Sequence, residues 1–207
     1  MRTARNSREL CLGGSFNPPH VGHLITARAA AEAGGFDRVR LIVAGRSPHK
    51  VADRDVAPAG VRVAMTRAAV DGDPLFLVDD RELRRDGPSF TADTAEALQR
   101  ERGEGPIHWL IGVDLLSGLP TWHRAAELTA DPPTLVQFVV MARGGHRVDA
   151  AMLPASVRHL AAAIVEVPRV EISSSDIRRR LREGRPIRYL VPPTVEEMAR
   201  SVYPSGA

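Results

Sequence analysis

The sequence predicts an α/β fold built on a doubly wound parallel sheet. Short apolar runs alternate with stretches of helical pattern along most of the 207 residues, and such alternation is typical of a parallel sheet with helices on both faces. The run at 136–140 is apolar almost throughout, which indicates a strand buried on both sides. From about residue 173 only helical patterns follow, so we expect one domain, residues 1–207, with a small C-terminal helical segment.

The expected elements follow in chain order. Strands are predicted at residues 10–12, 39–43, 75–78, 107–111, 135–141 and 164–167. Helices are predicted at residues 22–33, 61–70, 90–102, 115–117, 155–163, 177–183 and 195–202. Residues 45–60 are expected to form a loop, and Arg81, Arg84 and Arg85, interleaved with acidic residues, indicate a salt-bridged surface. Because ligands of such sheets bind beyond the carboxyl ends of the strands, the loops that follow the strands are the candidate site.

Composition narrows the class of protein. No apolar run approaches the roughly 18 residues that a membrane helix needs, and we see no signal peptide. Cys11 is the single cysteine, which excludes an internal disulfide and fits a reducing cytoplasm. The isoelectric point of about 9.7 resembles that of a nucleic-acid binder, but the net charge is only +3. The basic residues are spread along the chain, so no nucleic-acid partner is expected; the sequence leaves open a homo-oligomer.

The segment 13–23, Gly-Gly-Ser-Phe-Asn-Pro-Pro-His-Val-Gly-His, is the most informative feature of the chain. It joins the first expected strand to the first expected helix, and a helix start offers free N–H groups and a partial positive charge to an anion. Gly13, Gly14 and Gly22 leave room for a ligand to approach the backbone. His20 and His23 can donate hydrogen bonds into the same space. The segment therefore predicts a phosphate site with neutral or weakly basic donors.

Other interpretations of this segment are weaker. It matches neither the P-loop pattern nor the glycine spacing of dinucleotide-binding turns. A zinc site would need at least one further ligand besides His20 and His23, and Cys11 lies in the expected strand, so no metal held by side chains is expected. An ordinary helix start with two surface histidines is the remaining alternative, and the glycines and prolines around the histidines argue against it.

A second phosphate candidate is the segment 172–178, Ile-Ser-Ser-Ser-Asp-Ile-Arg. Serine hydroxyls and free N–H groups at a helix start face an anion, and Arg178 follows one turn later. A plain helix cap followed by a solvated arginine face is the alternative, which we prefer for Arg179, Arg180 and Arg182. For Arg178 the residues alone leave both interpretations open, and Asp114 is equally open between a helix cap and a ribose ligand.

Together the two segments resemble the nucleotide-binding motifs of the nucleotidylyltransferase superfamily. Segments 47–50, 88–94, 111–114 and 119–122 narrow the resemblance, over roughly residues 8–200, to the bacterial nicotinate-nucleotide adenylyltransferases. The resemblance implies a Rossmann-like fold and a cytoplasmic enzyme of NAD biosynthesis. Such an enzyme joins ATP to nicotinate mononucleotide and releases deamido-NAD and pyrophosphate by direct in-line attack, without a covalent enzyme intermediate. It also implies Mg²⁺ held mainly by the ATP phosphates.

The resemblance also implies roles for individual residues. His20, His23 and Arg178 would be the catalytic groups, with His23 closest to the developing charge. Nine residues would bind ATP: Gly14, Ser15, Phe16, His20, His23, Gly112, Ser174, Ser175 and Arg178. Six would bind the acceptor or its ribose, with Trp122 stacked on the pyridine ring: Lys50, Thr91, Asp114, Trp122, His123 and Arg143. Asn17 and Ser47 depart from the family pattern, which often has aspartate and proline there.

Overall fold

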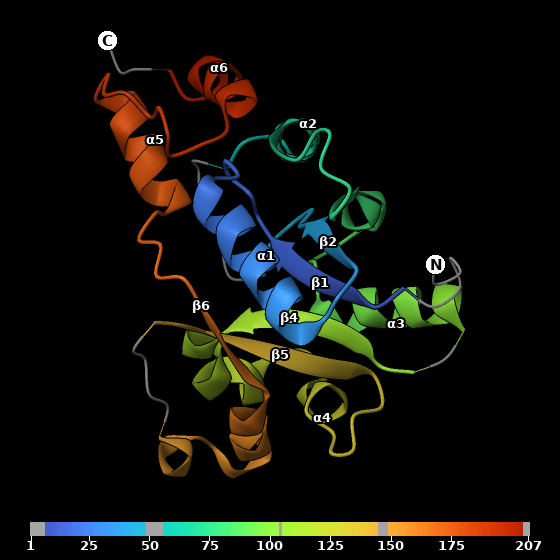
Figure 1. Ribbon diagram of the computed structural model, residues 1–207. Helices are drawn as coiled ribbons and strands as arrows, with labels where there is room; N and C mark the ends of the chain where they lie inside the picture. The colour runs from blue at the N-terminus through green and yellow to red at the C-terminus, as the bar shows by residue number, and fades with distance from the viewer. Residues whose placement is uncertain (1–6, 49–55, 104, 145–148, 205–207) are drawn as a thin grey trace.

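The computed structural model describes residues 7–48, 56–103, 105–144 and 149–204. Its centre is a six-stranded parallel sheet with the strand order β3-β2-β1-β4-β5-β6 (Figure 1). The strands are β1 (Glu9–Gly14), β2 (Arg38–Val43), β3 (Phe76–Asp79), β4 (Ile107–Gly112), β5 (Val136–Arg143) and β6 (Ile164–Val167). All six predicted strands are therefore confirmed, as is the doubly wound α/β fold.

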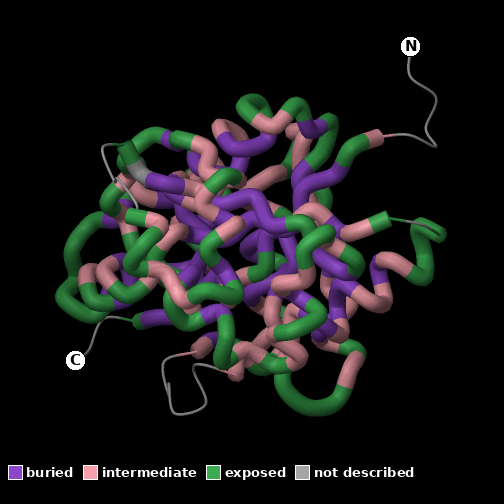
Figure 2. Tube along the Cα trace, turned by 90° about the horizontal axis from the view of Figure 1, so that it is seen from below, coloured by how far each residue is buried: buried purple, intermediate pink, exposed green. Residues whose placement is uncertain are grey.

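Helices cover both faces of the sheet because side chains of a strand alternate between its two sides. Leu10, Leu41 and Leu110 pack on one face against α1 (Val21–Gly34) and α2 (Ala59–Ala69). Cys11 and Trp109 belong to the core on the other face. That face is covered by the α-helices α3 (Thr91–Arg102) and α4 (Ala125–Leu128) and the 3₁₀-helices η3 (Val113–Thr121) and η5 (Ala155–Ala163). Figure 2 shows the buried segments in the middle of the molecule and the exposed ones around them.

The C-terminal segment consists of α5 (Ser174–Arg182) and α6 (Pro193–Val202), and it has its own small core. Ile177 and Val195 are fully buried there against Met65 of α2. The backbone N–H of Val21 donates to the carbonyl of Leu190 at 3.0 Å. The segment is thereby attached to the beginning of α1, and Figure 1 shows α5 beside that end of the helix.

Two predicted helices have a different geometry from the α-helix. The stretches 115–117 and 155–163 lie in the 3₁₀-helices η3 and η5. Val113, Leu116 and Leu119 in η3 face the core at intervals of three residues, as do Val157, Leu160 and Ala163 in η5. A 3₁₀-helix has three residues per turn, so this spacing places each of these side chains on the same side.

Three short elements were not predicted: α4, η2 (Arg81–Arg84) and η4 (Ala150–Met152). Each is about one turn long, too short for a periodic pattern to show in the sequence. Within the described ranges no helix is long and apolar enough to cross a membrane.

The salt-bridged surface expected around residues 79–86 is partly wrong. Arg84 does pair with Asp80 at the surface, at 3.0 Å, but Asp79 and Glu82 are buried. Arg40 and Arg81 both donate to Asp79, at 2.8 and 2.7 Å. Burial alone would raise the pKa of Asp79, but the hydrogen bonds from Arg81 and Arg40 outweigh it and hold the pKa below its usual value. Asp79 lies in the edge strand β3, where the fold buries it with Arg40 and Arg81 as partners. The linear pattern of charges does not reveal this burial.

Candidate active site

The candidate site lies where the strand order reverses. β1 and β4 are neighbours in the sheet, although β1 connects onward to β2 on its other side. In such sheets the helices that follow two diverging strands leave a crevice at their carboxyl ends. Cys11 pairs with Trp109, so Gly14 and Gly112, each three residues further on, end their strands at this edge. The first motif (residues 13–23) and the segment that begins at Gly112 therefore lie side by side at the carboxyl ends of β1 and β4.

The turn after β1 is shaped by Phe16. This residue has a φ of 46°, in the left-handed region that side chains rarely adopt, and burial of its ring, which is 2% exposed, holds it there. A Cβ atom on Gly14 would lie 3.0 Å from that ring. The absence of a side chain on Gly14 therefore lets the Phe16 ring pack against the backbone of the turn. Ser15, between these two residues, is half-buried.

The two histidines form a single unit at the start of α1. His20 is the N-cap residue in an extended conformation, and its ring stacks on that of His23 with centroids 3.6 Å apart. The backbone N–H of His20 donates to Nδ1 of His23 at 3.2 Å. Because Nδ1 accepts a hydrogen bond, the network assigns the proton of the neutral His23 imidazole to Nε2. His23, which is half-buried, thus carries an N–H donor at the helix start, the arrangement that suits a phosphate oxygen.

The second motif meets the first across most of the chain. Arg178 donates from Nη1 to the carbonyl of Asn17 at 3.0 Å, a separation of 161 residues. Ser174 donates from its hydroxyl to the carbonyl of Pro18 at 2.8 Å. The predicted phosphate motifs therefore converge on the two residues that precede Pro19 and His20. Arg178 is buried, with 5% of its surface exposed.

These contacts refine what the serines and Asn17 do. The Ser174 hydroxyl acts as an anchor for the turn, whereas Ser175 is exposed on the first turn of α5. Ser173 is the N-cap, and its hydroxyl accepts from the N–H of Asp176 at 3.1 Å. Asn17, which departs from the family pattern, is 1% exposed and accepts on Oδ1 from the N–H of Ala57 at 2.9 Å and from the hydroxyl of Tyr203. An amide oxygen therefore serves here as a buried acceptor without adding charge.

At the end of β4, Asp114 folds back over Gly112. A Cβ atom on Gly112 would lie 2.2 Å from Oδ1 of Asp114, so a side chain at this position would displace the carboxylate from where it lies. Asp114 is exposed in the first turn of η3 and forms no N-cap for it, because Gly112 is the N-cap residue and no side chain caps it. The cap interpretation is thereby weakened, and the carboxylate stands at the strand end as an acceptor.

The predicted acceptor-binding residues gather at the start of α3 and the end of η3. Thr91 is the first residue of α3, and Trp122 packs partly buried against the core. The ring of His123 stacks on Phe90 with centroids 4.3 Å apart, and its Nε2 lies 3.6 Å from Asp93. Phe90 and Asp93 were not predicted as site residues. No local signal links them to His123, because the contact joins two segments about thirty residues apart.

Two predicted residues are not placed beside the others. Lys50 lies outside the described residues, and so does the side chain of Arg143, whose backbone ends β5. Their roles stay predictions.

Sequence reasoning also missed Arg62 of α2. This arginine is 2% exposed, and its Nη1 donates to the carbonyl of Ser15 at 2.7 Å, inside the first motif. α2 has two arginines, Arg62 and Arg67, and their sequence neighbours do not show that Arg62 is the buried one, so only the fold identifies it.

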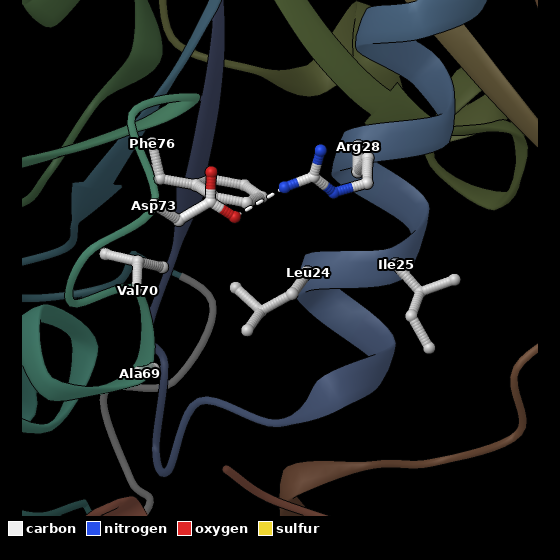
Figure 3. Close-up of a pocket in the computed structure, with 7 residues that line it drawn as sticks. All are labelled: Leu24, Ile25, Arg28, Ala69, Val70, Asp73 and Phe76. Carbon is white, nitrogen blue, oxygen red and sulfur yellow. Dashed lines mark hydrogen bonds and ion pairs between the residues drawn. The ribbon is translucent and has the colours of Figure 1, made fainter.

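A hollow of about 130 Å³ lies away from these residues, between α1, the end of α2 and β3 (Figure 3). Leu24, Ala69, Val70 and Phe76 line it, and so do Arg28 and Asp73, which form an ion pair. It shares no residue with the site described above.

Comparison with known proteins agrees with this geometry. The family model described as cytidylyltransferase-like matches residues 11–180. A probable nicotinate-nucleotide adenylyltransferase of Thermus thermophilus is 42% identical over 184 residues, covering 89% of this chain and 91% of that protein. A relative with the same description from Thermomicrobium roseum is 40% identical over 195 residues, covering 92% and 88%.

Among solved structures, the nicotinic acid mononucleotide adenylyltransferase of Plasmodium falciparum complexed with NaAD superposes with a TM-score of 0.73. The superposition covers 94% of this chain and 95% of the Plasmodium chain. The two sequences are 15% identical, so the match shows a shared fold. The family match and the sequence relatives go further than fold. The chain belongs to the cytidylyltransferase-like family of nucleotidyltransferases and, within it, to the nicotinate-nucleotide adenylyltransferases.

Proposed function

We propose that this enzyme transfers the adenylyl group of ATP to nicotinate mononucleotide and so makes deamido-NAD and pyrophosphate for NAD biosynthesis. The convergence of two helix starts carries the proposal: Arg178 is bonded to the carbonyl of Asn17 and Ser174 to that of Pro18, next to the stacked pair of His20 and His23. A triphosphate needs several donors fixed around one path, and this meeting of the two motifs supplies them.

The reaction is a direct displacement. An oxygen of the acceptor's 5′-phosphate attacks the α-phosphorus of ATP, a new P–O bond forms, and the bond to the bridging oxygen breaks. Pyrophosphate leaves with that electron pair. The attacking phosphate is already ionised near neutral pH, so no protein base is required.

The protein contributes position and charge stabilisation. Nε2–H of His23 donates to the phosphate oxygens nearest the reacting phosphorus, His20 supports its ring, and Arg178 holds the departing β- and γ-phosphates together with Ser175 and the N–H groups of α5. Gly14, Ser15, Phe16 and Gly112 line the nucleotide, and Ser174 fixes the turn.

The acceptor occupies the exposed side of the site. Asp114 accepts hydrogen bonds from ribose hydroxyls. Trp122 stacks on the pyridine ring, and Thr91 with the backbone at His123 receives its carboxylate. Lys50 and Arg143 bind the acceptor's phosphate.

No covalent enzyme intermediate takes part. Burial raises the pKa of the Cys11 thiol to about 12, so this side chain stays protonated inside the sheet and is a poor nucleophile. It also fits an enzyme that works in the reducing cytoplasm.

Mg²⁺ is the cofactor of this proposal. The ion prefers oxygen ligands, whereas the side chains at the start of α1 are the imidazoles of His20 and His23. Among the described residues no three acidic, histidine or cysteine side chains are grouped for a metal. ATP phosphate oxygens are therefore the expected ligands, and the bound ion would neutralise part of their charge.

A panel of acceptors tests the function. Pyrophosphate release is measured with ATP and nicotinate mononucleotide, nicotinamide mononucleotide or phosphopantetheine, each with and without Mg²⁺. We expect nicotinate mononucleotide to give the highest kcat/KM and the reaction to depend on the metal. Preference for phosphopantetheine would contradict the acceptor while leaving adenylyl transfer in place, and no turnover with any acceptor would contradict catalysis.

Two further expectations concern partners. The protein should bind no nucleic acid, since its basic residues are spread along the chain and no aromatic residues interleave with the arginines at 178–182. A steeply salt-dependent affinity for DNA or RNA would contradict this. Sedimentation of the purified protein would establish whether it forms a homo-oligomer.

A further inference from the structure

Arg62 links three separate backbone segments near the site. Its Nη1 donates to Ser15 at 2.7 Å, its Nη2 to Gly45 at 3.1 Å and its Nε to Ala57 at 3.0 Å. All three acceptors are backbone carbonyls. Burial lowers the pKa of the Arg62 guanidinium, yet an arginine keeps its proton in proteins. A buried cation is costly unless its hydrogen bonds are satisfied, so this placement has to be maintained by those three contacts.

The three carbonyls belong to different parts of the site. Ser15 lies in the turn that follows β1 and carries the ATP motif. Gly45 lies in the chain that follows the neighbouring strand β2. Ala57 precedes α2, and its N–H donates to Oδ1 of Asn17 at 2.9 Å. The planar guanidinium therefore sets the spacing between the turns that follow two adjacent strands.

From Gly45 the contacts continue to the acceptor side. The N–H groups of Gly45 and Arg46 donate to the hydroxyl oxygen of Ser89 at 3.0 and 3.3 Å. The N–H of Ser89 donates back to the carbonyl of Arg46 at 2.8 Å. Ser89 stands two residues before Thr91, which begins α3. One continuous path thus leads from the ATP turn through Arg62 to the segment predicted to receive the pyridine carboxylate.

This path has little room to adjust. A Cβ atom on Gly45 would lie 2.5 Å from the carbonyl oxygen of Glu82. Glu82 is itself buried and accepts from the hydroxyl of Thr94 in α3 at 2.5 Å. The chain after β2 is therefore fitted closely between Arg62 and the region that leads into α3.

We propose that Arg62 is a positioning residue of adenylyl transfer, which fixes the ATP turn against the acceptor-binding segment. The inference rests on the proposed function, because it concerns the alignment of the two substrates. Their reacting atoms must meet in line, and a misplacement of about 1 Å can cost roughly 100-fold in rate. Lysine keeps the charge but lacks the rigid fork that holds three acceptors at once.

The test compares Arg62→Lys, Ser89→Ala and the double variant with wild type. Arg67→Gln is the matched control, because Arg67 lies in the same helix with a side chain that is 58% exposed. For each protein we measure kcat, KM for ATP, KM for nicotinate mononucleotide and Tm, with assays well below the lowest Tm.

We expect Arg62→Lys to lower kcat about 10- to 100-fold with a KM for ATP within about threefold of wild type, since alignment is lost more than binding. Ser89→Ala should lower kcat about 3- to 10-fold, and the double variant should be no worse than Arg62→Lys alone, because both changes interrupt one path. Arg67→Gln should match wild type.

A fall in Tm with wild-type kcat in Arg62→Lys would show a purely structural role and overturn the inference, as would fully additive losses in the double variant. If Arg62→Lys does not fold, the kcat of Ser89→Ala tests the inference. An unchanged kcat in Ser89→Ala then overturns the inference. A wild type that prefers another acceptor contradicts the proposed function instead, and the same series is then run with that acceptor. An inert wild type contradicts both.

Discussion

The two proposed halves of the site are built in different ways: the ATP half at residues 13–23 and 172–178, and the acceptor half at the start of α3 and the end of η3. In the ATP half, Arg178 and Ser174 bind the backbone carbonyls of Asn17 and Pro18, and His20 is 5% exposed. In the acceptor half, side chains hold one another at the surface: His123, with a side chain that is 44% exposed, stacks on Phe90 and approaches Asp93. One half is therefore organised by the main chain before any substrate arrives, and the other by exposed side chains.

This difference indicates a division of labour. Main-chain carbonyls are present whatever the side chain, so contacts to them preserve the geometry of a phosphate site with few sequence requirements. Exposed side chains are replaced more easily, and we expect those of the acceptor half to select between acceptors. Changes in the ATP half should therefore lower kcat, whereas changes in the acceptor half should raise the KM for the mononucleotide.

The largest effect is expected for His23→Ala. Loss of one donor to developing charge typically lowers kcat by about 10²–10³, and the half-buried position should leave the fold intact. His23→Gln keeps an N–H group close to the position of Nε2 and should recover part of the rate. Steady-state kinetics and circular dichroism check both variants, with His159→Ala in η5 as a control. Near-normal activity of His23→Ala would remove the imidazole from the mechanism.

Trp122→Ala should act mainly on the acceptor. Aromatic stacking on a base is worth about 1–3 kcal/mol, so the KM for nicotinate mononucleotide should rise about 5- to 150-fold. The KM for ATP should change little. Trp122→Phe retains a ring and should stay within about threefold of wild type. An equal rise in both KM values would indicate that Trp122 only supports the core, against which it packs.

Glu82, which accepts a hydrogen bond from Thr94 of α3, should make the stability of the fold depend on pH. Burial raises the pKa of Glu82 above its ordinary value of 4.5, although hydrogen bonds from Thr94 and Ser89 act in the opposite direction. A carboxyl whose folded pKa is raised stabilises the fold most below the unfolded pKa, and this contribution is lost as the pH rises through the folded pKa.

Glu82→Gln keeps an acceptor for Thr94 and removes this titration. Its free energy of unfolding should therefore fall less than that of wild type between pH 4.5 and neutrality. Urea denaturation across this range measures the difference. Parallel curves for the two proteins would show that Glu82 titrates normally.

The smallest effect is expected for the contact between Tyr203, which follows α6, and Asn17 in the first motif. Tyr203→Phe removes the hydroxyl that donates to Asn17, while the N–H of Ala57 still satisfies the same oxygen. One net hydrogen bond is worth about 1 kcal/mol, so Tm should fall by about 2–4 °C with kcat within about twofold. Calorimetry with a parallel assay measures both. A large loss of kcat would mean that the C-terminal helices hold the turn more actively than we infer.

Much of the fold was readable from local pattern. The sequence predicted buried strands at residues 107–111 and 135–141 because nearly every residue in them is apolar. The alternation of strands with helices predicted their parallel arrangement. The three-residue spacing of Val113, Leu116 and Leu119 was also present, but a pattern so short did not distinguish a 3₁₀-helix from an α-helix. The burial of Asp79 escaped prediction because its partner Arg40 lies on a different strand.

The amino-acid sequence by itself identified the two candidate phosphate motifs, since glycines, histidines and helix-capping serines act through neighbours a few residues away. It also determined which strands are buried. The tertiary structure alone decided that Arg178 rests on Asn17 and that Arg62 joins Ser15 to Gly45. These contacts depend on where distant segments come to lie, because one backbone carbonyl resembles another in sequence and only packing selects which one a guanidinium reaches.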